Sequence, residues 1–254
     1  MLRDGLRTEI DTKVVRLLQK GTYDLKRHNV ETNALRELAN LYSWWLEHPA
    51  LRKELLLVEK EEGIQGIKRR ARCGRKAIED AWKFLKKETG RDIEGKLSHE
   101  VIIETGRIIN PDVQGYRGSR VTLGFPRYTP PNPIRVPDKV EELLAYLRAH
   151  KEDMHAIERA AYLHLALAGI QPFRDGNKRT ARLMQDKLLA DHSYPPAVIH
   201  PGERRIYLDV LEGGLADWQD GKVDGVSRFE DFVASKVNMA LDDMLGDLRV
   251  NCRR

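Results

Sequence analysis

The sequence has few cysteines and no long apolar run, and both absences narrow the classes of protein to which it can belong. Its two cysteines, Cys73 and Cys252, lie far apart and have no metal-ligand spacing around them. They indicate neither a disulfide framework nor a zinc site. The longest apolar stretches, such as residues 165–170, fall far short of the ~20 residues that cross a bilayer, and the N-terminus lacks the apolar segment of a signal peptide. We therefore expect a soluble, cytoplasmic protein with no membrane partner.

Charge of one sign is not in large excess either. The net charge is +5, but 39 acidic residues interleave with 44 basic ones along most of the chain. The one local concentration of basic residues, 68–76, has no aromatic residues between its charges. Such a run is more typical of a solvated face than of a nucleic-acid site, so nucleic acid is not an expected partner. The sequence leaves self-association open.

Strand-type alternation is rare, whereas apolar residues recur at intervals of three and four, which is typical of amphipathic helices. A chain of 254 residues can also bury a substantial core. The helix at 154–168 is apolar on nearly every side and is predicted to be the buried centre of the fold. We therefore predict an all-α protein, a helical bundle around this central helix. The helices expected from the pattern are 33–47, 77–87, 97–109, 138–149, 154–168, 178–190, 204–211 and 229–245.

Two stretches interrupt the helical pattern. The polar residues 90–95 predict a boundary between an N-terminal helical region, residues 1–92, and a domain that covers residues 93–254. The segment Gly115–Pro137 contains five prolines and three glycines. Its residues 120–125 are β-formers, and the prolines beyond them forbid helix, so we predict a short β-hairpin or an extended flap.

The residues most suggestive of chemistry join the central helix to the helix at 178–190. They read Gln171-Pro172-Phe173-Arg174-Asp175-Gly176-Asn177-Lys178-Arg179-Thr180-Ala181-Arg182. Pro172 stops one helix and Gly176 permits a tight turn. The next helix then begins with unpaired N–H groups and the positive end of its dipole. Three basic side chains at the same end strengthen the prediction of an anion site; they are Lys178, Arg179 and Arg182.

Asp175 precedes the glycine turn, where its carboxylate could hold a Mg²⁺ that bridges phosphate oxygens. A P-loop is excluded, because residues 176–180 lack both the spaced upstream glycine and the Lys-Ser/Thr pair. On these residues alone, two interpretations stay open. One is a site for nucleotide phosphate and metal, and the other is a basic helix start that Asp175 caps.

The loop resembles the Fic-family motif, His-Pro-Phe-x-Asp/Glu-Gly-Asn-Gly/Lys-Arg-x-x-Arg, at every defined position except the first. Flanking segments resemble the family as well: residues 160–164 its buried helix, Gly115-Tyr116-Arg117 with residues 128–131 its flap, and residues 204–208 the helix beyond. The likeness covers roughly residues 97–245. Lys178 is also similar to the related Doc kinases, but these lack a glycine at the position of Gly176, which favours the AMP-transfer orientation of the nucleotide.

The resemblance implies a Fic-type helical domain with a flap, which moves AMP from ATP to a Ser, Thr or Tyr hydroxyl of a protein target. Asp175 would bind Mg²⁺ and Phe173 would anchor the loop in the core. Gly176, Asn177, Lys178 and Arg179 would hold the α- and β-phosphates, and Arg182 would reach the γ-phosphate. Asp175 and Arg179 count as catalytic on this basis. The flap would hold the target backbone by strand addition through Arg120, Val121, Thr122, Leu123, Gly124 and Phe125.

The departure at Gln171 bears on activity, because the family has a histidine there that acts as general base. A glutamine amide cannot take a proton, and losing general-base catalysis typically removes ~10²–10⁴-fold in rate. We therefore expect an inactive or strongly impaired enzyme. Three explanations of the glutamine stay open: an engineered change, a natural loss of the base, or a base supplied by another group. His164 is the nearest other candidate in sequence, but at 1.5 Å per residue it lies ~10 Å away, so a buried histidine that fixes the loop is favoured.

Residues 28–33 weakly resemble the inhibitory motif of many Fic proteins, in a predicted inhibitory helix near residues 28–47. Glu31 would then pair with Arg182 and block the γ-phosphate site. The alternative is that Glu31 starts a surface helix, where a carboxylate suits the helix dipole. For the whole chain, the alternative to an adenylyltransferase is a non-enzymatic Fic-like module that binds a nucleotide, a peptide or another partner.

Overall fold

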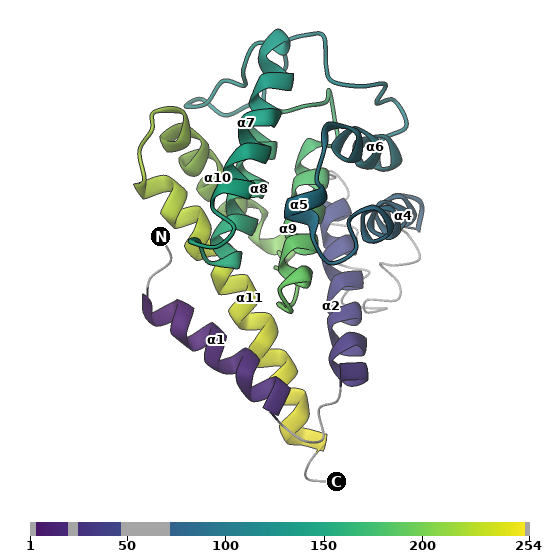
Figure 1. Ribbon diagram of the computed structural model, residues 1–254, viewed down its shortest axis with the longest axis vertical. Helices are drawn as coiled ribbons and strands as arrows, with labels where there is room; N and C mark the ends of the chain where they lie inside the picture. The colour runs from purple at the N-terminus through teal and green to yellow at the C-terminus, as the bar shows by residue number, and fades with distance from the viewer. Residues whose placement is uncertain (1–3, 20–24, 47–71, 252–254) are drawn as a thin grey trace.

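The computed structural model describes residues 4–19, 25–46 and 72–251, and every regular element within these ranges is a helix (Figure 1). The prediction of an all-α fold is confirmed. The elements are α1 (Asp4–Gln19), α2 (Leu25–Leu46), α4 (Arg72–Thr89), α5 (Ile93–Lys96), α6 (His99–Ile109), η2 (Pro133–Arg135), α7 (Val136–Ala149), α8 (Ala156–Ile170), α9 (Asn177–Asp191), η3 (Pro201–Glu203), α10 (Arg204–Gln219) and α11 (Asp224–Asn251).

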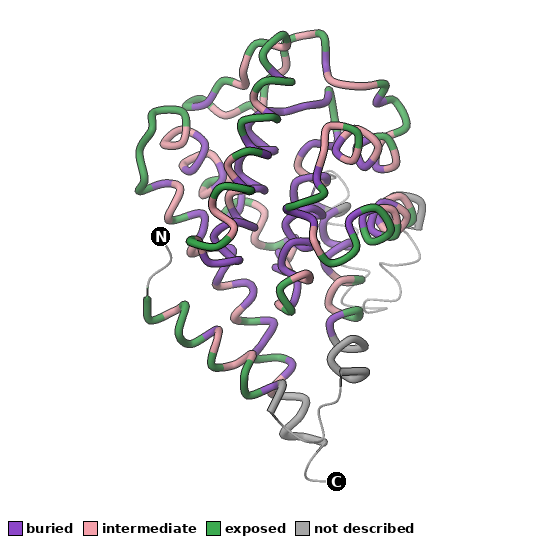
Figure 2. The backbone as a smooth tube through the Cα atoms, viewed as in Figure 1, coloured by how far each residue is buried: buried purple, intermediate pink, exposed green. Residues whose placement is uncertain are grey.

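Helix α8 forms the centre of the bundle, as its sequence predicted. Every residue from Ala156 to Ile170 is buried except Tyr162, which is half-buried. The helix packs most extensively against α9, and α7, α10 and α11 cover its other sides. Figure 2 shows buried positions concentrated in the middle of the bundle. The loop from Gln171 to Gly176 joins these two central helices, so both ends of the loop are fixed by the core.

Several helices are longer than their apolar pattern indicated. Helix α2 begins at residue 25 and α4 at residue 72, while α10 continues to residue 219. The apolar stripe marks only the part of a helix that meets the core, so polar first and last turns escape a periodicity argument. Helix α1 lies in the predicted N-terminal helical region but was not predicted as a separate helix. It packs against α11 through the buried side chains of Ile10 and Leu17.

The N-terminal helices contribute to the same hydrophobic core as the rest of the chain. Helix α2 packs against α9 and α4, and α4 packs against α6. The boundary near residue 92 stays a prediction. The basic run at 68–76 lies partly outside the described residues, and its last residues begin α4. Among the described helices, none combines the length and the apolar character needed to cross a bilayer.

Residues 110–132, between α6 and η2, contain neither helix nor strand (Figure 1), and we keep the name flap for them. The last residues of the predicted flap, 133–137, form η2 and the start of α7, because proline is tolerated in the first turn of a helix. The predicted β-hairpin is therefore wrong, and the extended alternative applies. Residues 120–125 have no paired strand, because the prolines that follow them lack the N–H groups that a hairpin ladder needs. The bend instead comes from a short turn in which Gly124 has φ +71 and its N–H donates to the Thr122 hydroxyl at 3.1 Å.

Candidate functional site

Two left-handed residues shape the loop between α8 and α9. Gln171 ends α8 with φ 50, and Gly176 precedes α9 with φ 89. A glycine adopts this conformation without the steric cost that a Cβ adds. The chain consequently reverses within a few residues, and the first N–H groups of α9 face the same side as the loop.

Asn177 holds the loop closed through its side-chain amide. Its Oδ1 accepts from the N–H of Phe173 at 2.8 Å, and its Nδ2 donates to the carbonyl of Phe173 at 2.8 Å and to Oε1 of Gln171 at 3.0 Å. The residue is 4% exposed. Its amide is thus committed to the loop, and only its backbone N–H remains as a donor to an anion.

The ring of Phe173 anchors the loop in the core, where the sequence comparison with the Fic motif placed it. The residue is buried, and a Cβ at Gly106 on α6 would lie 2.4 Å from its ring. Tyr116 at the root of the flap stacks on the same ring, with 6.4 Å between the ring centroids. Any side chain at position 106 would therefore displace Phe173 and the loop with it.

The side chain of Gln171 is turned inward. Its Nε2 donates to the carbonyl of Ala168 at 2.6 Å, while its Oε1 accepts from Asn177. The residue is buried, yet it lines one wall of a small pocket in front of the loop. An amide in these contacts is a fixed structural group and has no means of accepting a proton.

That pocket has a volume of about 150 Å³ and lies between the loop and the flap. Thr122 and Leu123 form its flap side, and the loop supplies the rest from Gln171 and residues 174–179. We call it the cationic pocket, because its charged side chains are Arg174, Asp175, Lys178 and Arg179. The N-terminus of α9 opens into it, so helix dipole and basic side chains favour an anion at the same place.

Arg179 carries the most informative contact in the cationic pocket. One terminal nitrogen donates to the Asp175 carboxylate at 2.8 Å. Its Nε is buried and has no hydrogen-bond partner among the described residues. A buried donor without an acceptor is costly, and a bound anion would relieve that cost.

Among the residues that the structure describes, Asp175 supplies the only carboxylate that lines the cationic pocket, and its side chain is 72% exposed. In the part of the chain that the structure describes, no cluster of three or more His, Cys, Asp or Glu residues could hold a metal ion. A single carboxylate nevertheless fits Mg²⁺, which commonly takes one or two protein carboxylates and completes its shell with phosphate oxygens and water.

Arg182 does not line the cationic pocket. Its guanidinium is buried between α2 and α10. Nε donates to the Ser43 hydroxyl at 2.9 Å, a terminal nitrogen donates to the Ser43 carbonyl at 2.9 Å, and the other donates to the Tyr207 hydroxyl at 3.1 Å. Ser43 was not singled out in the sequence, because a lone serine in a helix carries no signal of such a contact.

The predicted partner of Arg182 was Glu31, which belongs to α2. Its side chain lies outside the described residues, so that prediction stays open. What the structure adds is that α2 reaches Arg182 through a residue twelve positions further along the same helix, Ser43.

His164 does not fix the loop, contrary to the interpretation favoured from sequence. Its Nδ1 lies 2.7 Å from Oε1 of Gln185, and its Nε2 lies 3.0 Å from the Tyr207 hydroxyl. It is completely buried. A tautomer with the proton on Nδ1 satisfies both contacts, since Tyr207 then donates to Nε2 and accepts from Arg182. The histidine therefore supports Tyr207 behind Arg182.

Arg117 connects the flap to the loop. The sequence placed this residue in the flap but gave no sign of this contact. Its Nε donates to the carbonyl of Gln171 at 2.6 Å, and its terminal nitrogens donate to the carbonyls of Ser119 at 3.0 Å and Pro131 at 2.6 Å. Its backbone N–H donates to the carbonyl of Pro172 at 2.9 Å. One buried guanidinium thus joins both limbs of the flap to the start of the loop.

Comparison with known proteins agrees with this geometry. Residues 94–189 match the model of the Fic/DOC family, and these residues contain the whole loop and the flap. These residues of the chain therefore form a Fic/DOC domain. A relative in Drosophila persimilis, protein adenylyltransferase Fic, is 32% identical over 128 residues, which are 50% of this chain and 23% of that protein. The protein of the same name in Culex quinquefasciatus is 35% identical over 98 residues, 38% of this chain and 19% of that protein. The match thus spans about a quarter or less of these Fic proteins.

Solved structures share the Fic fold over nearly all of this chain. A Fic-domain signalling protein from Bacteroides thetaiotaomicron superposes with a TM-score of 0.72 at 22% identity, covering 93% of this chain and 94% of that one. Fic-1 from C. elegans gives 0.70 at 21% identity, with 97% and 72% covered. IbpAFic2 tethered covalently to Cdc42 gives 0.55 at 19% identity, with 92% and 70% covered. At these identities the likeness shows the fold alone.

Proposed function

We propose that this chain is a protein adenylyltransferase domain that binds Mg²⁺ and ATP and is impaired in transfer because position 171 is glutamine. The single observation that carries the proposal is the cationic pocket beside the N-terminus of α9. Arg179 lines this pocket, and its buried Nε has no acceptor within the described part of the chain. The Fic relatives named protein adenylyltransferase supply the reaction class.

In this proposal different residues of the loop bind different parts of ATP and its metal ion. The backbone N–H groups of Asn177 and Lys178 and the guanidinium of Arg179 hold phosphate oxygens. Asp175 would hold the metal ion, which would supply neutralisation of the phosphate charge. Arg182 reaches the γ-phosphate after leaving Ser43. The flap residues 120–125 hold the target backbone, which orients a hydroxyl toward the α-phosphate.

Gln171 occupies the position from which a base would take the proton of that hydroxyl. Its amide carbonyl is able to orient the hydroxyl but cannot accept the proton. Binding without efficient transfer is therefore the expected state of the chain. The protein nature of the target is supported by the solved Fic neighbour that is tethered to Cdc42, and the target of this chain is proposed only as a Ser, Thr or Tyr hydroxyl of a protein.

Calorimetric titration with ATP tests the binding half of the proposal. We expect saturable binding that requires Mg²⁺, and Arg179→Ala should weaken it at least tenfold, because a charge-assisted hydrogen bond to phosphate contributes roughly 1.5–3 kcal/mol. Arg205→Ala, a change at a side chain 93% exposed on α10, is the matched control. Absence of ATP binding in the parent chain and also in Glu31→Gly would contradict the proposal.

The alternative is a Fic-like module without enzymatic activity that uses the flap and the basic loop to hold a partner. It is favoured if ATP does not bind under either condition, and it predicts that Arg179→Ala changes partner capture without changing any nucleotide affinity.

A further inference from the structure

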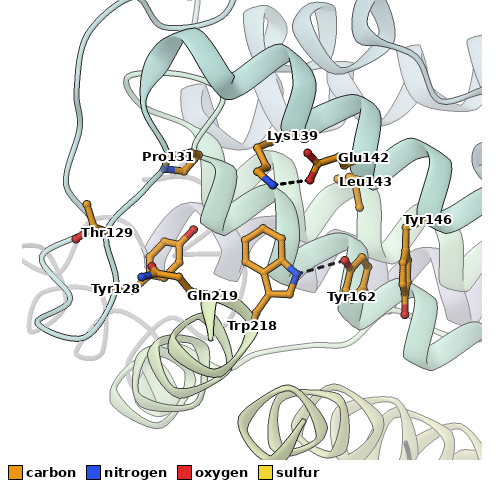
Figure 3. Close-up of a pocket in the computed structure, with 10 residues that line it drawn as sticks. All are labelled: Tyr128, Thr129, Pro131, Lys139, Glu142, Leu143, Tyr146, Tyr162, Trp218 and Gln219. Carbon is orange, nitrogen blue, oxygen red and sulfur yellow. Dashed lines mark hydrogen bonds and ion pairs between the residues drawn. The ribbon is translucent and has the colours of Figure 1, made fainter. Parts of the chain in front are cut away.

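A second pocket, of about 530 Å³, lies between the end of the flap, α7, α8 and α10 (Figure 3). None of its lining residues lines the cationic pocket. Its walls are rich in aromatic rings, and we call it the aromatic pocket. The residues that line it are Tyr128, Thr129, Pro131, Lys139, Glu142, Leu143, Tyr146, Tyr162, Trp218 and Gln219.

Three of its rings are held in place by one another. Tyr146 and Tyr162 stack with 4.0 Å between their centroids and 24° between their planes. Trp218 lies beside them and donates its indole N–H to the Tyr162 hydroxyl at 3.3 Å (Figure 3). Rings fixed in this way offer rigid faces on which a ligand can stack without a large ordering cost.

Tyr128 forms the fourth aromatic wall and contributes a polar group that the protein leaves unused. The residue is 5% exposed, and its hydroxyl makes no hydrogen bond within the described part of the chain. Figure 3 shows the hydroxyl pointing away from the flap backbone, toward the interior of the pocket. A ligand that brings a hydrogen-bond acceptor into the pocket could accept from this hydroxyl.

The charges in and near the aromatic pocket cancel in pairs. Lys139 lies 2.5 Å from Glu142 within the pocket, and Lys222 lies 2.7 Å from Asp220 just beyond Gln219. The pocket therefore favours a ligand without net charge. Its donors include the Tyr128 hydroxyl and the two other protons of the Lys139 ammonium.

We propose that the aromatic pocket binds a proline-rich segment of a partner protein in the polyproline II conformation. Such a segment presents flat apolar rings to aromatic walls, carries no charge, and offers backbone carbonyl acceptors without N–H donors. These three properties match the stacked rings, the paired charges and the unused Tyr128 hydroxyl. The proposal does not depend on ATP binding.

The place of the aromatic pocket suggests what such binding does. Tyr128 lies against α8 close to the loop. A Cβ added to Gly169, which is two residues before Gln171, would lie only 2.9 Å from the Tyr128 hydroxyl. Arg117 also joins the carbonyl of Pro131, in the wall of the aromatic pocket, to the carbonyl of Gln171. A partner held in the aromatic pocket is therefore held beside the loop, and its proline-rich segment acts as an anchor separate from the residue that would meet the cationic pocket.

An oligoproline peptide of about ten residues, a length that spans several turns of polyproline II, is the probe for titration against the full chain. We expect it to bind and to change the tryptophan fluorescence, and we expect Trp218→Phe to remove most of that change. Tyr128→Phe deletes one hydroxyl and should weaken binding about three- to tenfold, as expected for one hydrogen bond. Ile134→Ala, at an exposed side chain outside the pocket, is the matched control.

A glycine–serine peptide of the same length and a lysine-rich peptide complete the experiment. The inference is overturned if oligoproline binds no better than either peptide, or if Tyr128→Phe binds it as well as the parent chain does. Thermal unfolding of both tyrosine and tryptophan variants shows whether each remains folded. Because Arg179→Ala should leave oligoproline binding unchanged and Tyr128→Phe should leave ATP binding unchanged, failure of this inference is distinguishable from failure of the proposed function.

Discussion

The side-chain amide of Asn177 donates to Oε1 of Gln171 at 3.0 Å across the loop. In Gln171→His an imidazole would stand in this place, with a ring nitrogen that can accept a proton near neutral pH. We expect transfer of label from ATP to protein to rise about 10²–10⁴-fold in this variant, the usual contribution of a general base. The measurement is incorporation of labelled AMP into a cell lysate.

Two controls accompany the histidine variant. Gln171→Ala should stay as inactive as the parent chain, and the double variant with Arg179→Ala should lose the gained activity. A histidine variant that binds ATP but labels neither itself nor any protein would contradict the adenylyltransferase proposal.

The contact between Ser43 and Arg182 should oppose ATP binding, because Arg182 has to leave Ser43 to meet the γ-phosphate. In Ser43→Ala one of its two acceptors on α2 is lost while the backbone carbonyl remains. We expect ATP to bind roughly two- to tenfold more tightly, which corresponds to one hydrogen bond of about 0.5–1.5 kcal/mol. Affinity for ADP, which has no γ-phosphate, should not change.

The matched control is Ser235→Ala, which removes a serine hydroxyl that donates to the carbonyl of Phe232 within another helix, α11. Equal gains in ATP and ADP affinity would show that Ser43 acts through general destabilisation and would contradict the proposed competition for Arg182.

Arg117 should determine how firmly the flap is held. A lysine in its place has one ammonium and cannot reach the carbonyls of Gln171, Ser119 and Pro131 together. We expect Arg117→Lys to reduce the free energy of unfolding by about 2–4 kcal/mol, because buried carbonyls lose charge-assisted donors. Amide hydrogen exchange in residues 118–131 should accelerate. Arg127→Lys, at an exposed arginine of the same flap, should change neither quantity.

Asp186 should make the stability of the fold depend on pH. Burial raises its pKa to about 7, although its carboxylate accepts from the N–H of Ala197 and from Gln185. In the unfolded chain its pKa returns to about 4. Between about pH 4 and about pH 7 the folded state therefore holds a proton that the unfolded state has released, and stability falls as pH rises.

We expect Asp186→Asn to remove this contribution, whose slope reaches at most about 1.4 kcal/mol per pH unit. Urea denaturation of both proteins across the same pH range measures the difference. Asp209→Asn on the exposed face of α10 is the control. A difference between Asp186→Asn and the parent chain that stays constant with pH would contradict the assignment.

The sequence by itself determined the helical class, the buried central helix and the position of the loop that is proposed to bind an anion. These depend on local properties. They are the period of apolar residues over 154–168, the helix stop at Pro172 with the turn at Gly176, and the basic residues at the start of α9. Each is encoded within a few neighbouring positions, which is why periodicity and turn chemistry find them. The expectation that Gln171 cannot act as a base is equally local, because it follows from the chemistry of one side chain.

Only the tertiary structure decided which distant groups meet. Ser43 reaches Arg182 across 139 positions of the chain, and Arg117 reaches the Gln171 carbonyl across 54. His164 likewise turned out to support Tyr207 instead of the loop. The predicted β-hairpin in the flap was also wrong. Strand pairing depends on a partner segment and not on β-forming residues alone. Hydrogen bonds between separate helices and loops depend on packing geometry, which residue type and spacing do not encode.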